Sequence, residues 1–298
     1  MMEKEMDIGN ILKEYDEMFA VKSAHEIADF LAFHVDQAMI AGEKGALLTL
    51  LNEQIGFSRD TGMKETCLTA CETLRELLDD MNLVGTIHYG KSLLNISNAY
   101  RALGYYDAAG KIFPEVEAVY KEQLEYGAYE FAALYNNWSL MCMDIGEPYQ
   151  AIEYLKESIR VIDRFEQAAI KQATSRVNLA CAILALPDNE DGVSVCSEDT
   201  SGNLAHSQLL YKLQETRIEE AQRYIDEAIQ LFEEKGGDDY HYSSALSARG
   251  DVHMLLGRYS EAIRDFTRAM DIFRLYMGET SNTKLLADKI AQANEMIT

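Results

Sequence analysis

Residues 255–270, LLGRYSEAIRDFTRAM, contain the pattern that decides the fold of this chain. Gly257 stands between two stretches of helix-forming residues, and glycine is the residue that most easily takes the left-handed conformation in which helices end. After this turn, Ala262 and Phe266 are four positions apart and share one helix face. The small alanine lets a neighbouring helix approach closely, and the larger phenylalanine fills the space beside it. The segment therefore predicts two antiparallel helices joined by a glycine turn.

The same helix–turn–helix unit recurs with a fixed period. Three glycines that end a first helix are spaced 42 residues apart: Gly62, Gly104 and Gly146. An alanine recurs five positions after the turn glycine in three units: Ala109, Ala151 and Ala262. Small residues also mark the predicted close crossings on the first helices: Ser97, Ser139, Ala180 and Gly250. Repetition at this length is typical of solenoids, in which each unit buries its apolar face against its neighbours.

These residues resemble the tetratricopeptide-repeat (TPR) family. Residues 257–269 closely follow the family pattern Gly-x-Tyr-x-x-Ala-x-x-x-Phe-x-x-Ala, and the unit that contains Gly104 follows it nearly as well. The unit after it has Pro148 in place of the tyrosine, and the first unit has Cys67 and Cys71 at the small and bulky positions. The resemblance covers roughly residues 43–277.

The period of 42 is longer than the common TPR period of about 34 residues. It resembles the kinesin light chain branch and the bacterial peptide-pheromone receptors. The resemblance implies an all-α fold, a right-handed α-solenoid of antiparallel helix pairs. It also implies a concave groove that binds a protein or an extended peptide.

We expect capping helices at both ends of the repeat array. Residues 1–41 are predicted to be N-terminal capping helices, residues 42–281 the repeat array, and residues 282–298 a C-terminal capping helix. The predicted helices lie near 5–18, 24–41, 44–59, 64–80, 86–103, 106–126, 128–145, 148–166, 168–186, 216–235, 240–256, 259–277 and 282–297. Pro114 lies inside one of them, and we expect a kink there.

An acidic insertion at about residues 187–207, PDNEDGVSVCSEDTSGNLAHS, interrupts one repeat between its two helices. It has no helical periodicity, and the second helix is predicted to resume by Thr216. Two interpretations remain open: a disordered loop, or a segment that folds over the groove as a lid or self-ligand. Under the first, residues 188–203 are the first internal site of limited proteolysis.

An asparagine column is the sharpest candidate for a binding site. Asn95, Asn137 and Asn178 fall at equivalent places in three successive repeats, spaced 42 and then 41 residues apart. The family resemblance implies that these asparagines face the groove and pair with the backbone of an extended peptide, since an amide offers both a donor and an acceptor. The alternative is that they only hydrogen-bond neighbouring helices.

Basic and aromatic residues on the same helices are candidates to border the groove: Lys91, Arg101, Arg176 and Trp138, with Arg249 as a further basic candidate. Cations on one face of an acidic array would receive the carboxylates of a peptide. The alternative is ordinary pairing with nearby glutamates. The pattern does not reproduce the carboxylate clamp that binds chaperone tails.

Charge and composition exclude several partner and site classes. The net charge of −23 repels phosphate backbones and anionic lipids, so we expect neither nucleic acid nor membrane as a partner. The five cysteines show no disulfide-like spacing, and Cys67, Cys71, Cys142 and Cys181 are predicted to be buried core residues. No apolar run is long enough for a signal peptide or a membrane span, so the chain is predicted to be cytoplasmic.

The sequence predicts binding rather than catalysis. It contains no nucleophile–base arrangement, phosphate loop or metal motif, and we expect no enzyme activity, cofactor or metal. The leading hypothesis is a protein- or peptide-binding scaffold, as a sensor or adaptor. The alternative is a structural module that self-associates as a homo-oligomer without a dedicated peptide ligand.

Overall fold

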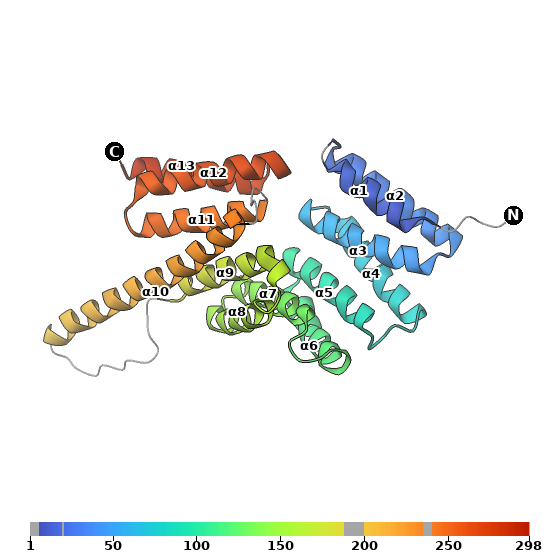
Figure 1. Cartoon of the computed structure of the whole chain (residues 1–298), viewed down its shortest axis with the longest axis horizontal. Coiled ribbons are helices and arrows are strands. Elements are labelled where there is room, and N and C mark those ends of the chain that lie inside the picture. The colour runs from blue at the N-terminus through green and yellow to red at the C-terminus, as the bar shows by residue number, and fades with distance from the viewer. Residues whose placement is uncertain (1–5, 20, 188–199, 235–239, 298) are drawn as a thin grey trace. The chain divides into compact units, whose positions relative to one another are not determined.

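The computed structural model of the chain describes residues 6–19, 21–187, 200–234 and 240–297, with side chains from 200–211, 213, 240 and 277 left undescribed. Every regular element in these ranges is a helix (Figure 1). Contacts divide the chain into two compact units, Met1–Ala128 and Tyr129–Thr298, hereafter unit 1 and unit 2. Nothing in the repeat pattern predicted this division.

Unit 1 contains six helices: α1 (Ile8–Met18), α2 (Ala24–Ala41), α3 (Lys44–Asp60), α4 (Lys64–Asp80), α5 (Ile87–Ala102) and α6 (Tyr106–Gln123). Helices α3 and α4 pack as one pair and α5 and α6 as the next, with α3 also against α5. Helix α6 continues through Pro114, and the kink expected there stays a prediction.

Unit 2 contains α7 (Tyr129–Asp144), α8 (Pro148–Ile162), a 3-10 turn (Glu166–Ala168), α9 (Ala169–Leu184), α10 (Thr200–Glu234), α11 (Tyr240–Leu255), α12 (Tyr259–Met277) and α13 (Ser281–Glu295). The pairs are α7 with α8, α9 with α10 and α11 with α12, and α13 packs on α12. The fold is therefore the predicted all-α arrangement of stacked helix pairs.

The glycine turns form as the sequence predicts. Gly104 and Gly257 have φ values of 81° and 68°, in the region that favours glycine. In each case the glycine lies between the first and second helix of a pair. The turns therefore reverse the chain at the repeat positions.

The repeat residues form the core. The alanines on the second helices are completely buried: Ala109, Ala151, Ala221 and Ala262. Gly250 on α11 shows why small residues stand at the crossings, because a Cβ atom added to it would lie 2.4 Å from Cε1 of the buried Phe266 ring. Close approach of the two helices, rather than backbone conformation, therefore requires glycine at 250.

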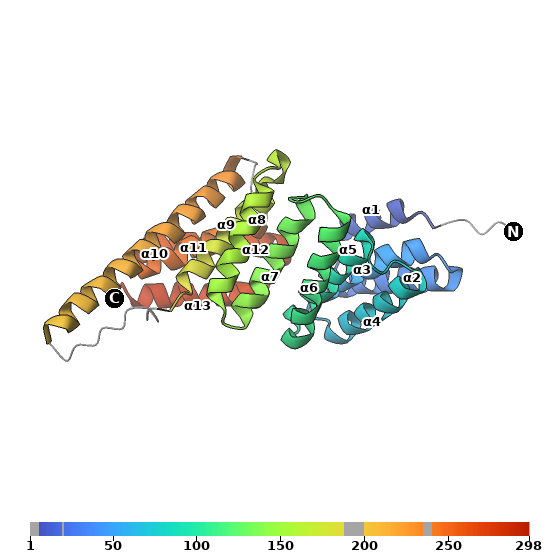
Figure 2. The ribbon, with the colours of Figure 1, turned by 90° about the horizontal axis from the view of Figure 1, so that it is seen from below.

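The expected limits of the acidic insertion were partly wrong. Helix α10 begins at Thr200, well before Thr216, so the last part of the 187–207 stretch is helical (Figures 1 and 2). Residues 188–199 lie outside the described residues, as does most of the stretch predicted to be cut first by proteases. Among the α10 side chains that the structure describes, Ile218 is the first buried one, followed by Ala221.

Arg217 on α10 links this helix to the residues that follow the end of α9. Its Nη1 donates to the carbonyl oxygens of Leu186 and Pro187, at 3.3 and 2.8 Å. These carbonyls follow the C-terminal end of α9, where backbone acceptors lack helical partners. The chain therefore leaves α9 and re-enters the repeat at neighbouring positions.

In the part of the chain that the structure describes, no helix combines the length and the apolar character that crossing a membrane requires.

Candidate functional site

An accessible strip along α9 connects three pockets of unit 2. Lys171, Thr174, Asn178, Cys181 and Ala185 recur every three or four positions and share one side of the helix, here called the α9 strip. None of them is buried, whereas Ala173, Ala180 and Ala182 on other sides of the helix lie in the core. The pockets are lined by this strip together with residues of the helices around it.

The first pocket, called the amide pocket, has a volume of about 270 Å³. It is lined by the first half of α9, by α7, and by Ile162 and His241. Asn136 and Asn137 contribute their amides from α7, and Ile170 and Ile162 supply apolar wall. The pocket therefore combines a few polar groups with apolar surface, as small binding sites commonly do.

A hydrogen-bond network centred on Asn136 organises the amide pocket. Nδ2 of Asn178 donates to Oδ1 of Asn136 at 3.0 Å, and the Ser175 hydroxyl donates to the same oxygen at 3.3 Å. The Ser175 and Ser158 hydroxyls lie 3.1 Å apart, and Ser158 donates to the carbonyl of Ala132 at 2.9 Å. Both serines are buried, so the network fixes α7, α8 and α9 relative to one another.

Asn136 was not among the predicted site residues, although the residue spacing contained a signal for it. Asn95 and Asn137 are 42 residues apart, but Asn137 and Asn178 are only 41 apart. Asn136 restores the 42-residue spacing to Asn178, and the hydrogen bond joins these two. The two adjacent asparagines therefore have different contacts. Asn136 accepts hydrogen bonds from α9, and Asn137 lines the pocket with its oxygen unbonded among the described residues.

The asparagine nitrogens and oxygens have different surroundings. Nδ2 of Asn137 donates to the carbonyl of Ala133 at 2.9 Å, and in unit 1 Nδ2 of Asn95 donates to the carbonyl of Asn52 at 2.9 Å. The nitrogens therefore bond within or between helices, as the alternative interpretation held. Oδ1 of Asn95, Asn137 and Asn178 accepts no hydrogen bond from any residue that the structure describes.

The structure brings only part of the predicted site together. Asn137 lines the amide pocket and Asn178 the pocket next to it, both in unit 2. Asn95 lies in unit 1 on α5, with exposed Lys91 and half-buried Arg101. A single groove containing all three asparagines stays a prediction.

Three other predicted residues make contacts with neighbouring helices. Arg176 has its guanidinium between Asp163, at 2.8 Å, and Glu227, at 3.1 Å. Trp138 stacks on Tyr154 of α8 with ring centroids 4.5 Å apart and packs against the core. Arg249 likewise forms two bonds of 2.7 Å with Asp265. These contacts favour structural roles, and the binding role of Arg176 and Trp138 stays a prediction.

Lys171 differs from these basic residues. It is exposed at the start of the α9 strip, with Nζ 4.6 Å from the centroid of the Tyr129 ring. It forms no ion pair with any residue that the structure describes. In a chain of net charge −23, an accessible cation beside a pocket is a candidate contact for an anionic group.

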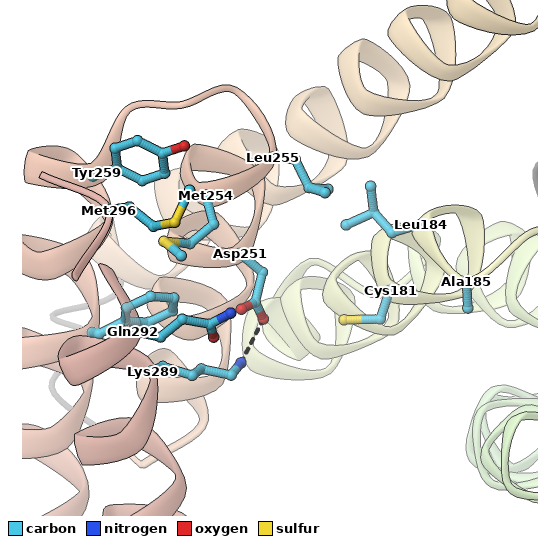
Figure 3. Close-up of a pocket in the computed structure, with 11 residues that line it drawn as sticks. Cys181, Leu184, Ala185, Asp251, Met254, Leu255, Tyr259, Lys289, Gln292 and Met296 are labelled. Atoms are coloured by element: carbon cyan, nitrogen blue, oxygen red, sulfur yellow. Dashed lines mark hydrogen bonds and ion pairs between the residues drawn. The ribbon is translucent and has the colours of Figure 1, made fainter. Parts of the chain in front are cut away.

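The second and third pockets continue along the strip and share Cys181, Asp251 and Lys289. The second has a volume of about 310 Å³ and contains Asn178. The ammonium of Lys289 lies 2.6 Å from Oδ2 of Asp251 (Figure 3). This ion pair marks the boundary between polar and apolar surface.

The third pocket, called the apolar pocket, is the largest of the three at about 620 Å³. Leu184 of α9 and Leu255 of α11 point toward one another across it, and Met254 and Met296 lie beside Tyr259 (Figure 3). Leu255 and Met296 are 54% and 56% exposed, so apolar surface is accessible here. Flexible methionines adapt to side chains of different shape.

The expectation that Cys181 is buried was wrong. Cys67, Cys71 and Cys142 are buried as predicted, but Cys181 is exposed in the pockets, because Ala180 and Ala182 occupy the core-facing positions around it. Its apolar surroundings and then the Asp251 carboxylate raise the pKa of the Cys181 thiol to about 11. Among the described residues, no three His, Cys, Asp or Glu side chains are grouped as metal ligands.

Comparisons with known proteins agree with the repeat assignment. Two family models, both of tetratricopeptide repeats, match residues 90–116 and 209–275. Neither describes an enzyme family, and a search of curated protein sequences finds no significant match.

Several solved structures are similar in fold. BtubC (BKLC) from P. vanneervenii is 16% identical with a TM-score of 0.52, covering 83% of this chain and 84% of that one. A putative kinesin light chain from Podosopora anserina, with nearly identical TPR-like repeats, is 12% identical with a TM-score of 0.52, covering 78% and 97%. The apo form of RapI is 14% identical with a TM-score of 0.54, covering 97% and 71%.

Proposed function

The chain is a tetratricopeptide-repeat protein, and we propose that it is a scaffold that binds an extended polypeptide segment along the α9 strip of unit 2. Repeats of this type are protein-interaction modules. The observation that carries the proposal is the pair of side-chain amides of Asn137 and Asn178, which line the first two pockets. Each is fixed through its nitrogen and keeps an oxygen without a partner among the described residues.

Fixed amide oxygens match the chemistry of a polypeptide backbone. An extended strand presents N–H donors at regular intervals, and pockets between these contacts receive alternate side chains. Because Asn137 and Asn178 are already oriented by their own hydrogen bonds, little side-chain entropy remains to be lost on binding. We infer that the amides recognise an extended backbone more than any particular side chain.

Charge supports a polypeptide as the partner class. A net charge of −23 disfavours nucleic acid and anionic membrane surfaces. Cys67, Cys71 and Cys142 are free thiols in the core, which fits a reducing compartment, and we propose the cytoplasm.

The test compares wild type with Asn137→Ala. Peptides selected from a display library on the full chain are titrated calorimetrically against both proteins. We expect Asn137→Ala to weaken binding by about 1–3 kcal/mol, since a peptide N–H loses its acceptor. Melting curves should match closely, because the Asn137 nitrogen bonds only to a carbonyl of its own helix. Equal affinities with matched melting curves would remove the amide-based proposal.

Self-association is a second candidate function, favoured by an exposed apolar face in unit 1. Phe33 and Ile40 are seven positions apart on α2 and are 58% and 81% exposed. Residues at this spacing share a helix face, and such faces commonly mark interfaces. Sedimentation analysis of wild type and of a Phe33→Ser, Ile40→Ser variant tests this: a dimer that dissociates in the variant supports it, and a monomer in both excludes it.

A further inference from the structure

The α9 strip presents different chemistry at its two ends. Lys171 stands at the start, in the amide pocket, as a cation without an ion-pair partner among the described residues. Ala185 stands at the other end, in the apolar pocket with Leu184 and Leu255. In the middle, Lys289 is already neutralised by Asp251. An incoming segment therefore meets one available positive charge at one end and accessible apolar side chains at the other.

We propose that the segment bound along the α9 strip carries a carboxylate near one end and a large aliphatic or aromatic side chain about six residues away. This inference rests on the proposed function and specifies the chemistry of the partner. The carboxylate would pair with Lys171, and the apolar side chain would enter the pocket formed by Leu184, Met254, Leu255 and Met296.

The separation follows from helix geometry. Lys171 lies in α9 and Ala185 is the C-cap of the same helix, 14 positions later. At about 1.5 Å per residue this corresponds to about 21 Å along the helix axis. An extended polypeptide advances about 3.3 Å per residue, so about six residues span the same length.

The two ends contribute in different ways. A carboxylate at Lys171 gains most from charge complementarity, because the rest of the chain is strongly acidic and repels it elsewhere. The apolar pocket, at about 620 Å³, has room for a leucine, methionine or phenylalanine side chain and offers exposed leucine and methionine surface to cover. The Asp251–Lys289 ion pair between them disfavours a bulky apolar residue in the middle of the segment.

The experiment uses random twelve-residue peptides displayed on phage and selected on the full chain. We expect the enriched peptides to carry Asp or Glu and a Leu, Met, Ile or Phe about five to seven positions apart. Synthetic copies of the enriched peptides are then titrated against variants by fluorescence anisotropy.

Matched pairs of variants test each end. Lys171→Glu should weaken binding at least tenfold, whereas Lys284→Glu, at an exposed lysine outside the three pockets, should change it less than twofold. Leu255→Asn should weaken binding at least tenfold, and Leu275→Asn, at a leucine 76% exposed on α12, should leave it unchanged. All four positions are surface positions, so comparable melting curves are expected.

The outcomes separate this inference from the proposed function. Enriched peptides that lose affinity in Asn137→Ala but not in Lys171→Glu or Leu255→Asn would overturn the inference and keep the amide-based surface. Loss at only one end would also overturn it, since both contacts are required. Peptides indifferent to Asn137→Ala would overturn the proposed function itself.

Discussion

At the scale of single residues, Gly250 shows how tightly the helix pairs pack. Its Cα faces the Phe266 ring, and an added Cβ would lie 2.4 and 2.6 Å from Cε1 and Cδ1 of that ring. Phe266 is completely buried. We expect Gly250→Ala to lower the free energy of unfolding by about 1–3 kcal/mol, although alanine favours helix over glycine by about 1 kcal/mol.

Gly56→Ala is the matched control for this prediction. Gly56 also lies inside a helix, α3, but an added Cβ there meets nothing within 4 Å. The control should be neutral or stabilising by about 0.5–1 kcal/mol in urea unfolding. If Gly250→Ala were as stable as Gly56→Ala, the close α11–α12 crossing would be wrong.

Cys181 gives a residue-scale prediction about pH. Because the thiolate is the reactive form and the pKa is raised to about 11, alkylation of Cys181 by iodoacetamide at pH 8 should be slower than that of free cysteine by about tenfold or more. The rate should rise about tenfold per pH unit between 8 and 10. Mass spectrometry of the tryptic peptide that contains Cys181 measures the alkylation rate, and buried Cys142 is the unreactive control. A rate that levels off near pH 8.5 would contradict the raised pKa.

The candidate site was only partly predictable from residue identity. The repeat period pointed to Asn137 and Asn178, and these two residues line neighbouring pockets. It did not reveal Asn136, whose role depends on which side of α7 faces α9. It also proposed Arg176 rather than Lys171, since only the three-dimensional structure shows Asp163 and Glu227 beside Arg176.

At the scale of elements, Arg176 joins three helices. Its side chain, 14% exposed on α9, reaches Asp163 at the end of α8 and Glu227 on α10. We expect Arg176→Gln to lower the free energy of unfolding by about 1–2 kcal/mol, because both carboxylates lose a fixed partner while staying partly hydrated.

The control for the Arg176 prediction is Arg160→Gln. Arg160 pairs with Glu157 three residues away on α8, and both side chains are nearly half exposed. Such pairs contribute little, so a change below about 0.5 kcal/mol is expected in the same thermal denaturation series. Equal effects of the two substitutions would show that Arg176 does not fasten the helices.

The positions of the helices were more predictable than the length of α10. Most of the expected segments begin and end within a few residues of observed helices, because glycine turns and apolar periodicity fix them locally; α2 and α12 agree at both ends. Helix α10 is different: it begins at Thr200, within a stretch that is rich in glycine and serine and whose sequence has no helical periodicity. A stripe-based prediction therefore starts this helix too late.

At the scale of the whole molecule, the net charge of −23 leads to a prediction about salt. Like charges repel most in the compact state, and screening relieves this repulsion within a Debye length of about 10 Å at 0.1 M salt. The melting temperature should therefore rise by several degrees between 20 and 300 mM NaCl, measured by differential scanning calorimetry. A falling melting temperature would mean that attractive ion pairs outweigh the repulsion.

The repeat architecture also explains how the chain tolerates its long interruption. In a stacked array each pair contacts only its neighbours, so stability is close to a sum of local interfaces. The interruption begins after Pro187, and Arg217, directly before buried Ile218, donates hydrogen bonds to the carbonyls of Leu186 and Pro187.

This closure makes the junction a natural grafting point. Hydrogen bonds from Arg217 hold the two ends of the interruption next to each other. The sequence between them can therefore be exchanged, in evolution or by design, for a tag, a second module or a cleavable arm. The neighbouring interfaces need not be redesigned, because Ala180 on α9 and Ala221 on α10 are completely buried on the two sides of the junction.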